Sequence, residues 1–326
     1  MKQRLFGILC IALLALALSA CGASDTASGS DISGDSLQIV ATIFPEYDWV
    51  NAVLGEASAD VEVTMLLDDG VDLHSYQPTV SDIATVSSCD MLIYVGGESD
   101  EWIEDALEES VNEDMIVVNL MEVLGENVRE EEDVEGMEAE TSSDSEEIEY
   151  DEHVWLSLQN AQVLVSAIAE ALSEADVANA DTYAANAVSY QESLKTLDAA
   201  YAEALAQASG DTLIFGDRFP FLYLLKDYGL NYYAAFAGCS AETEASFETI
   251  TFLAQQMDAL GANYVLVTES ADQRIAKTII ENTETADQEI LVLDSMQSVT
   301  AQDVAAGETY LSVMESNLEV LTTALQ

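Results

Sequence analysis

The chain has 326 residues, of which 62 are acidic and only 8 are Lys or Arg, so its formal net charge at pH 7 is −54. It lacks the clustered basic side chains that phosphate contacts need, which excludes nucleic acid as a partner. An anionic ligand would be repelled, whereas a cation would be steered toward the protein, although acidic residues also serve simply as a solvated surface. The chain has only two histidines, His74 and His153.

Residues 1–20 have the pattern of an export signal. A basic start precedes an apolar run over residues 5–18, which is shorter than the ~20 residues that a spanning helix needs. The run ends in Leu-Ser-Ala-Cys-Gly, which resembles a bacterial lipobox and implies cleavage before Cys21 and lipidation of its sulfur. Residues 21–36 have the Ser- and Gly-rich composition of a flexible tether. We therefore expect an extracytoplasmic protein, anchored to the cell membrane by lipid.

Two cysteines remain once Cys10 leaves with the signal and Cys21 carries lipid. Cys89 and Cys239 could pair outside the cell, but they fall in opposite halves of the chain. No CxxC pattern indicates a cysteine-based zinc site.

Apolar runs alternate with helical patterns through the first half. We expect helices at 47–54 and 102–107, and strands at 37–44, 60–67, 90–95 and 115–118. This alternation predicts an α/β lobe with a parallel sheet flanked by helices. Ligands bind such sheets at the carboxyl ends of the strands, and His74 follows the second strand directly.

The stretch 129–152 interrupts this pattern, because it is dense in Asp and Glu and poor in apolar residues. Its composition predicts a disordered acidic surface loop that leads straight into His153. Carboxylates beside a metal site could gather cations, or the stretch could be a tolerated insertion; the sequence leaves both open.

Residues 157–209 read as helical. The pattern from 179 to 208 predicts one helix of about 45 Å, which is longer than a single lobe and suits a rigid connection between two. We therefore expect an N-terminal metal-binding lobe at 37–156 and a C-terminal one at 210–326. The roughly 290 residues after the tether are enough for two lobes with separate cores.

The second half repeats the alternation of strands and helices. Asp217, Glu269 and Asp294 stand at the exits of predicted strands, where a ligand site is expected. The expected strands are 212–215, 231–235, 263–268 and 289–293, and the expected helices are within 219–228 and at 247–260, 273–281 and 303–325.

Several segments in this order resemble a known family. The chain is similar, over residues 38–326, to the zinc/manganese substrate-binding lipoproteins of bacterial ABC importers. The resemblance implies two α/β lobes joined by a rigid helix, an ion in the cleft between them, a monomer, and an importer permease and ATPase as partners. The segments that carry it are Ala41–Pro45, Gly70–Pro78, His153–Ser157, Ala241–Ser246, and Tyr310-Leu311 with Asn317-Leu318.

The resemblance implies His74 and His153 as metal ligands, and Asp294 matches an aspartate that the C-terminal lobe of the family often supplies. The family's third ligand position falls on Arg218, whose guanidinium stays protonated and cannot bind a cation. We predict that Asp217, beside it, takes that place. Glu269 is expected to accept a hydrogen bond behind the ligands rather than to bind the ion.

Two imidazoles with carboxylates suit Zn²⁺, whereas more oxygen ligands would favour Mn²⁺ or Fe²⁺. The insertion at 129–152 favours zinc, because zinc-specific members of the family often carry a loop there, although theirs is rich in histidine. A zinc hydrolase is disfavoured, since the chain has neither HExxH nor Gly-x-Ser-x-Gly. A surface adhesin stays an alternative. The expected function is capture of a divalent transition metal, with zinc favoured, and its delivery to an ABC importer.

Overall fold

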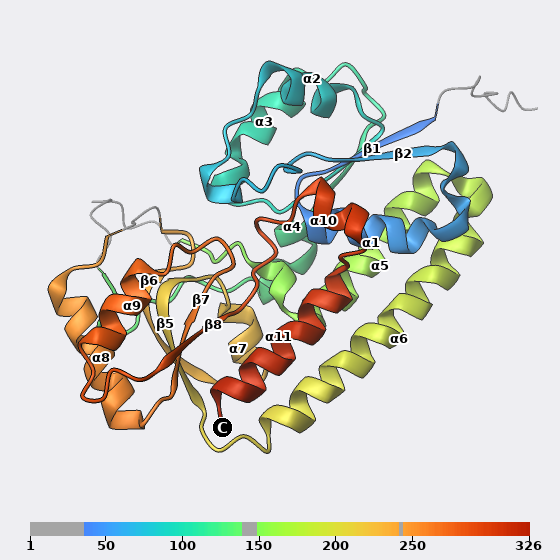
Figure 1. Cartoon of the computed structure of the whole chain (residues 1–326). Coiled ribbons are helices and arrows are strands. Elements are labelled where there is room, and N and C mark those ends of the chain that lie inside the picture. Colours follow the sequence, from blue (N-terminus) through green and yellow to red (C-terminus); the bar gives the residue numbers. More distant parts are fainter. Residues whose placement is uncertain (1–35, 139–148, 241–243) are drawn as a thin grey trace, which may run out of the picture. The chain divides into compact units, whose positions relative to one another are not determined.

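The computed structural model describes residues 36–138, 149–240 and 244–326. Residues 36–326 form one compact unit, which carries two parallel sheets and a long helix (Figure 1). The predicted signal and the lipidation site Cys21 lie outside the described residues. Within those residues, none of the helices is both long enough and apolar enough to cross a membrane.

Each half of the chain builds one four-stranded sheet, and all neighbouring strands pair in parallel. The two sheets have equivalent strand orders, β2-β1-β3-β4 and β6-β5-β7-β8. This confirms the predicted fold class. The strands are β1 (Leu37–Ala41), β2 (Val61–Met65), β3 (Met91–Tyr94), β4 (Ile116–Asn119), β5 (Thr212–Phe219), β6 (Asn231–Ala237), β7 (Tyr264–Val267) and β8 (Glu289–Val292).

Helices flank the faces of both sheets. The helices α2 and α3 bury apolar side chains against one face of the first sheet, and α8 and α9 do the same on the second. The helices are α1 (Phe44–Leu54), α2 (Val80–Ser88), α3 (Glu101–Glu108), α4 (Leu120–Leu124), α5 (Leu158–Ala175), α6 (Ala180–Leu205), α7 (Leu222–Asp227), α8 (Phe247–Leu260), α9 (Arg274–Glu281), α10 (Ala301–Ala306) and α11 (Tyr310–Ala324).

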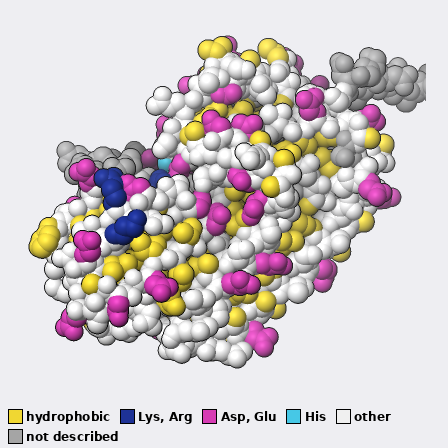
Figure 2. Space-filling view, viewed as in Figure 1, with side chains coloured by type: hydrophobic (Ala, Val, Ile, Leu, Met, Phe, Trp, Pro, Cys, Tyr) yellow, Lys and Arg dark blue, Asp and Glu magenta, His cyan; other side chains and the backbone are white. Residues whose placement is uncertain are grey.

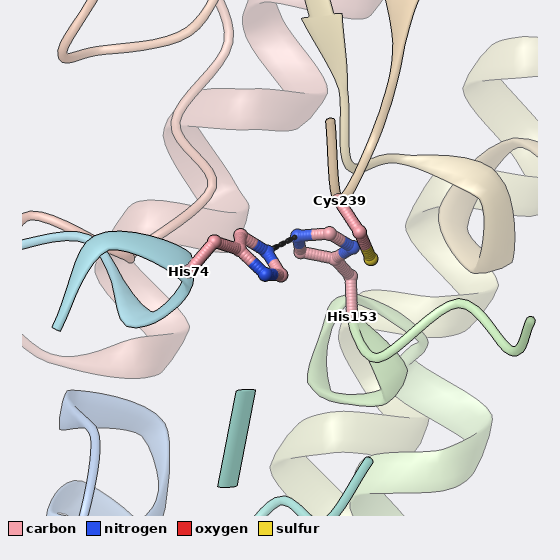
Figure 3. Close-up of side chains that lie close together, drawn as sticks. All are labelled: His74, His153 and Cys239. Atoms are coloured by element: carbon pink, nitrogen blue, oxygen red, sulfur yellow. Dashed lines mark hydrogen bonds between the residues drawn. The ribbon is translucent and has the colours of Figure 1, made fainter. Parts of the chain in front are cut away.

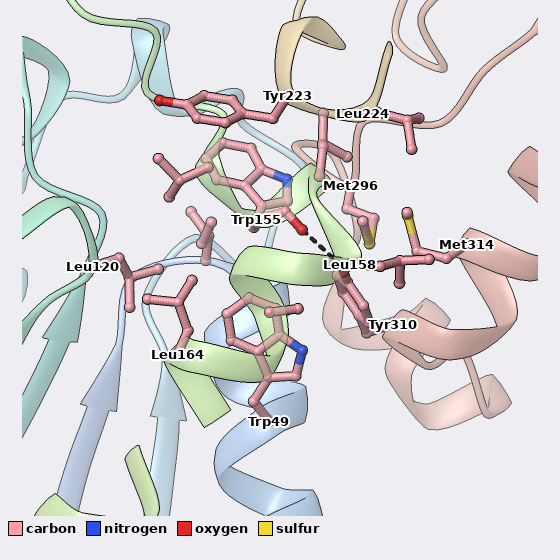
Figure 4. Packing of buried hydrophobic residues seen from close by; sticks show 14 of the residues in the cluster. Trp49, Leu120, Trp155, Leu158, Leu164, Tyr223, Leu224, Met296, Tyr310 and Met314 are labelled. Atoms are coloured by element: carbon pink, nitrogen blue, oxygen red, sulfur yellow. Dashed lines mark hydrogen bonds between the residues drawn. The ribbon is translucent and has the colours of Figure 1, made fainter. Parts of the chain in front are cut away.

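The other faces of the two sheets share one apolar core. Side chains alternate between the faces of a strand, so Val40 packs under α2 and α3 while its neighbour Ile39 points the other way. Ile39 belongs to a buried cluster that also contains Phe215 of the second sheet and Tyr310 of α11. The first sheet and the second sheet each have a buried cluster of their own on the outer face, and a third, shared cluster joins the two halves, which the expectation of separate cores did not include. The sheets are distinct, but side chains of their inner faces belong to one buried cluster, and Figure 4 shows the part of it around Trp155 and Tyr310.

The long helix α6 confirms the predicted connecting helix, with slightly narrower bounds. Its 26 residues correspond to about 39 Å. It packs against α5 and contacts α1 and α11, and Figure 1 shows it running alongside these helices. It buries a stripe of side chains that recur every three or four residues, among them Tyr183, Ala187, Leu194 and Tyr201.

The single helix expected at 303–325 is instead two helices, α10 and α11. Gly307 adopts a positive φ of 101° and caps the end of α10, a conformation that glycine reaches without steric cost. Two residues later, the Thr309 side chain accepts a hydrogen bond from the backbone N–H of Ser312 and begins α11. A prediction from apolar periodicity alone does not detect the capping residues Gly307 and Thr309, so it joins the two helices into one.

The described parts of the acidic stretch 129–152 are ordered, which corrects the expectation of a disordered loop; its residues 139–148 lie outside the description. Glu130 and Tyr150 form an antiparallel bridge, and the backbone N–H of Glu131 donates to the carbonyl of Glu149 at 3.0 Å. Glu138 reaches the start of α8, where its Oε2 accepts from the backbone N–H of Ser246 at 2.8 Å. The acidic composition suggested disorder, but a carboxylate can also be held in place by accepting hydrogen bonds from backbone N–H groups at a helix N-terminus, as Glu138 does.

Replacing Glu138 with alanine is expected to lower the free energy of unfolding at pH 7 by about 0.5–1 kcal/mol, the usual value of a helix cap. The hydrogen bond from Ser246 lowers the pKa of Glu138. The stabilisation is therefore present above the pKa of an unfolded glutamate and lost as the pH falls through the folded value. Urea denaturation at pH 7 and pH 3.5 measures both effects. Glu135→Ala, at an exposed position of the same stretch, is the control and should leave stability unchanged.

Candidate metal site

His74 lies in the loop that follows β2, at the carboxyl end of the first sheet. Asp72 fixes this loop, because its Oδ1 accepts a hydrogen bond from the backbone N–H of His74 at 3.0 Å. The Nδ1 atom of His74 lies 2.8 Å from the hydroxyl of Ser99 and 3.5 Å from the carboxylate of Glu152. These contacts leave the other ring nitrogen, Nε2, facing His153.

His153 follows the acidic stretch and is fully buried. Asp151 holds it twice, because one carboxylate oxygen accepts from the backbone N–H of His153 at 2.8 Å and lies 3.1 Å from its Nδ1. The ring packs 5.2 Å, centroid to centroid, from that of Trp155. A carboxylate on Nδ1 is the usual partner of a histidine that binds metal through Nε2, because it fixes the tautomer and orients the ring.

The two histidines point their Nε2 atoms at each other across 3.0 Å (Figure 3). Two such atoms on a tetrahedral zinc ion, with Zn–N bonds of about 2.0–2.1 Å, would be about 3.3 Å apart. A small outward movement of the rings is enough to admit the ion. The predicted meeting of His74 and His153, which are 79 residues apart in sequence, is therefore present in the fold.

The surroundings shift the pKa values of the two imidazoles in opposite directions. Burial, and then the neighbouring His153, lower the pKa of His74 to about 3, so its ring is neutral at pH 7. Burial opposes a charge on His153, but the carboxylate of Asp151 outweighs it and raises the pKa of His153. A proton shared by the two Nε2 atoms would occupy the position that an ion takes, so metal binding would displace it.

Sequence reasoning missed Cys239. Its sulfur and the imidazoles of His74 and His153 offer ligand atoms that all lie within 4.8 Å of one another, and the described residues show no other such trio of His, Cys, Asp or Glu. Cys239 follows β6, which ends at Ala237, so it stands at the carboxyl edge of the second sheet. The available signal was its place just after a predicted strand. Cys239 and Cys89 are both free in the structure, so they do not pair.

Arg218, at the position of the family's third ligand, forms an ion pair instead. Its guanidinium lies 2.6 Å from a carboxylate oxygen of Asp72, the residue that fixes the His74 loop. Burial alone would raise the pKa of Asp72, but Arg218 outweighs it and the pKa is lowered. β5 reaches Phe219 and has an irregular register between Phe215 and Arg218, so this part of the chain is strand rather than a loop after a strand.

Asp217 lines a cavity together with His74 and Arg218, but one of its oxygens already has donors. That oxygen, Oδ2, accepts from the backbone N–H of Thr268 at 3.1 Å and from the Thr268 hydroxyl at 2.5 Å. Asp217 does not belong to the trio of ligand atoms. Its role as a ligand stays a prediction.

Asp294 and Glu269 lie at the exits of adjacent strands, β8 and β7. Burial, and then the charge of Glu269, raise the pKa of Asp294 to about 7. Glu269 accepts from the backbone N–H of Ser295 at 2.8 Å and from the hydroxyl of Ser298 at 3.1 Å. Asp294 is outside the trio as well, so its role as a ligand, like that of Glu269 behind the ligands, stays a prediction.

Two cavities reach His74. One, of about 320 Å³, is lined by two arginines and two aspartates, Arg218, Arg274, Asp217 and Asp272. The other, of about 240 Å³, also reaches Cys239 and is lined by the carboxylates of Glu98, Glu131, Glu149 and Glu152. Over the molecular face seen in Figure 2, acidic side chains are scattered rather than gathered in one patch. The glutamate-lined cavity therefore concentrates negative potential beside the histidines, where a cation would be attracted.

Comparisons with known proteins identify the family of the chain. A family model described as "Zinc-uptake complex component A periplasmic" matches residues 39–324. The zinc-binding lipoprotein AdcA of Streptococcus pneumoniae is 32% identical over 317 residues, which cover 96% of this chain and 60% of the relative. The chain thus spans little more than half the length of such streptococcal relatives. Its match to the zinc-binding protein AdcA of Streptococcus pyogenes covers 55% of that relative.

One relative has nearly the same length. The high-affinity zinc uptake system protein ZnuA of Bacillus subtilis is 26% identical over 325 residues, covering 100% of this chain and 99% of the relative. Among solved structures, the Zn(II)-bound ZnuA-like domain of Streptococcus pneumoniae AdcA superposes with a TM-score of 0.68 at 29% identity, covering 89% of this chain and 99% of that domain.

Proposed function

Because the chain belongs to the family of periplasmic zinc-uptake component A proteins, we propose that it captures Zn²⁺ outside the cytoplasm and delivers it to an ABC importer. The observation that carries this proposal is the pair of facing Nε2 atoms of His74 and His153, each with an oxygen acceptor at its Nδ1. Zinc is the cargo of this site. The protein acts by binding and releasing it, not by catalysis.

The surroundings of the pair fit capture of a cation. The glutamate-lined cavity offers the ion a route to the histidines, and the net charge of the chain attracts cations from solution. His74 is neutral and its Nε2 is close to the binding position, so little reorganisation precedes binding. Asp294 and Asp217 are the carboxylates proposed to approach the ion from the second sheet.

The partners follow from the family and from the export signal. We propose that a permease and an ATPase receive the ion from a monomer held on the outer face of the cell membrane by a lipid on Cys21. The site itself distinguishes cations from anions, since imidazole nitrogens bind transition metals and the surrounding carboxylates repel anions.

A metal titration tests the proposal. The chelator-treated chain from residue 22 onward is expected to take up one Zn²⁺ per molecule, measured by calorimetry and elemental analysis, and cells without the protein should need added zinc to grow in depleted medium. Failure to bind zinc, together with metal-independent binding to a host protein, would overturn the proposal and favour the adhesin alternative.

A further inference from the structure

Resting on the zinc-binding function proposed above, we propose that Cys239 is the third protein ligand of the ion and that its thiolate makes the site select Zn²⁺ over Mn²⁺. Figure 3 shows the sulfur of Cys239 close to the His153 ring, and Cys239 and His74 line the same glutamate-lined cavity. The three ligand atoms lie within 4.8 Å of one another. On a tetrahedral zinc ion, nitrogen and sulfur ligands with bonds of about 2.05 and 2.3 Å are about 3.6 Å apart, so the three side chains must approach by up to about 1.2 Å to contact one ion.

Cys239 fills a place in the ligand set that Arg218 leaves open. The Arg218 side chain is drawn to Asp72, and a guanidinium has no lone pair for a metal. β5 and β6 are neighbours in register, with Arg218 beside Phe236 and Phe219 beside Ala237. Cys239 therefore follows β6, the strand next to β5, which carries Arg218. The second sheet thus supplies a ligand from the neighbouring strand.

The backbone before Cys239 is shaped for this position. A Cβ atom on Gly238 would lie 2.9 Å from the carbonyl oxygen of Phe219 and 3.1 Å from Cε1 of His153, so only glycine allows the chain to pass this close to the His153 ring. The next residue is then held by its own backbone, because the N–H of Cys239 donates to the Glu131 carboxylate at 3.0 Å. The acidic stretch thus helps to place the sulfur as well as to line the cavity.

The chemistry of sulfur gives the site its selectivity. Burial, and then the carboxylate of Asp151, raise the pKa of the Cys239 thiol, so the sulfur releases its proton to solvent as the Zn–S bond forms. The resulting thiolate with two imidazoles is a ligand set that Zn²⁺ binds readily, with tetrahedral geometry. Mn²⁺ prefers oxygen ligands and stands below zinc in the general order of affinities. A site in which a carboxylate took the third place would discriminate less between the two ions. The thiolate therefore resolves the choice of metal that imidazoles and carboxylates leave open.

Cobalt tests the sulfur directly, because Co²⁺ replaces Zn²⁺ in tetrahedral sites and a cobalt–thiolate bond has a charge-transfer band in the near ultraviolet. In the chain from residue 22 onward, Cys89 and Cys239 are the only cysteines. The wild type and Cys89→Ser should both show the band on binding Co²⁺. Cys239→Ser should bind Co²⁺ without the band, and its preference for Zn²⁺ over Mn²⁺ should fall at least about tenfold.

The outcomes separate this inference from the proposed function. A wild type that binds Co²⁺ and Zn²⁺ without the band would overturn the role of Cys239 and leave zinc capture standing, whereas a wild type that binds neither ion would overturn zinc capture itself. If Cys239→Ser does not fold, thiol labelling of Cys89→Ser decides. Saturating Zn²⁺ should protect Cys239 from iodoacetamide, and unchanged labelling would contradict the inference.

Discussion

Replacing His74 with alanine is expected to lower the zinc affinity at least about 100-fold, since loss of even the outer partners of a metal ligand costs about 10–100-fold. The substitution removes a ligand whose Nε2 lies 3.0 Å from that of His153. It leaves the buried His153 with its Asp151 partner, so the fold should survive. Competition between the variant and a zinc chelator of known affinity measures the change.

Ser75→Ala is the matched control for His74→Ala. Ser75 is the next residue of the same loop and is exposed, so this variant should bind zinc as the wild type does. Equal affinities of the wild type and His74→Ala would show that the ion binds elsewhere, and both the proposed site and its sulfur ligand would fall.

Replacing Trp155 with alanine is expected to lower the free energy of unfolding by about 3–5 kcal/mol, the usual cost of emptying a large buried site. Trp155 is fully buried in the core common to both sheets. Its indole N–H donates to the carbonyl of Ser295 at 2.9 Å, and its own carbonyl accepts from the hydroxyl of Tyr310 at 2.7 Å (Figure 4). Urea denaturation followed by circular dichroism measures the loss.

A comparison of two conservative variants isolates the hydrogen bond of Trp155. Trp155→Phe leaves the carbonyl of Ser295 without its donor, whereas within the described residues the indole nitrogen of Trp102 has no hydrogen-bond partner. Trp155→Phe should therefore cost about 1–3 kcal/mol more than Trp102→Phe. Equal losses of unfolding free energy in the two variants would mean that the hydrogen bond between Trp155 and Ser295 contributes nothing to stability.

Most of the fold could be predicted because apolar runs report burial directly. Each of the expected strands corresponds to a strand of the two sheets, since a strand buried on both faces is a continuous apolar run. The wrong boundaries lie where a proline or a glycine starts or ends a helix inside an apolar pattern. Phe44 and Pro45 begin α1 rather than end β1, because proline suits the first turn of a helix. Gly307 breaks the last helix for an equally local reason.

The site could be predicted only in part. His74 and His153 belong to segments that resemble known ligand loops, and the structure brings them together. Cys239 has no such local pattern, because its role depends on the pairing of β5 with β6. The pairing of Arg218 with Asp72 was also beyond the sequence, since those residues are 146 positions apart and their contact arises only from the packing of the two halves.

The core common to both sheets sets the order in which the chain can fold. Trp49, in the first helix, packs its ring 5.1 Å, centroid to centroid, from that of Tyr310, in the last. The backbone N–H of Tyr310 also donates to the carboxylate of Asp48 at 3.2 Å. The first half therefore cannot complete its core until α11 has been synthesised, and contacts between segments so distant in sequence form slowly. This core is completed only after α11 has left the ribosome.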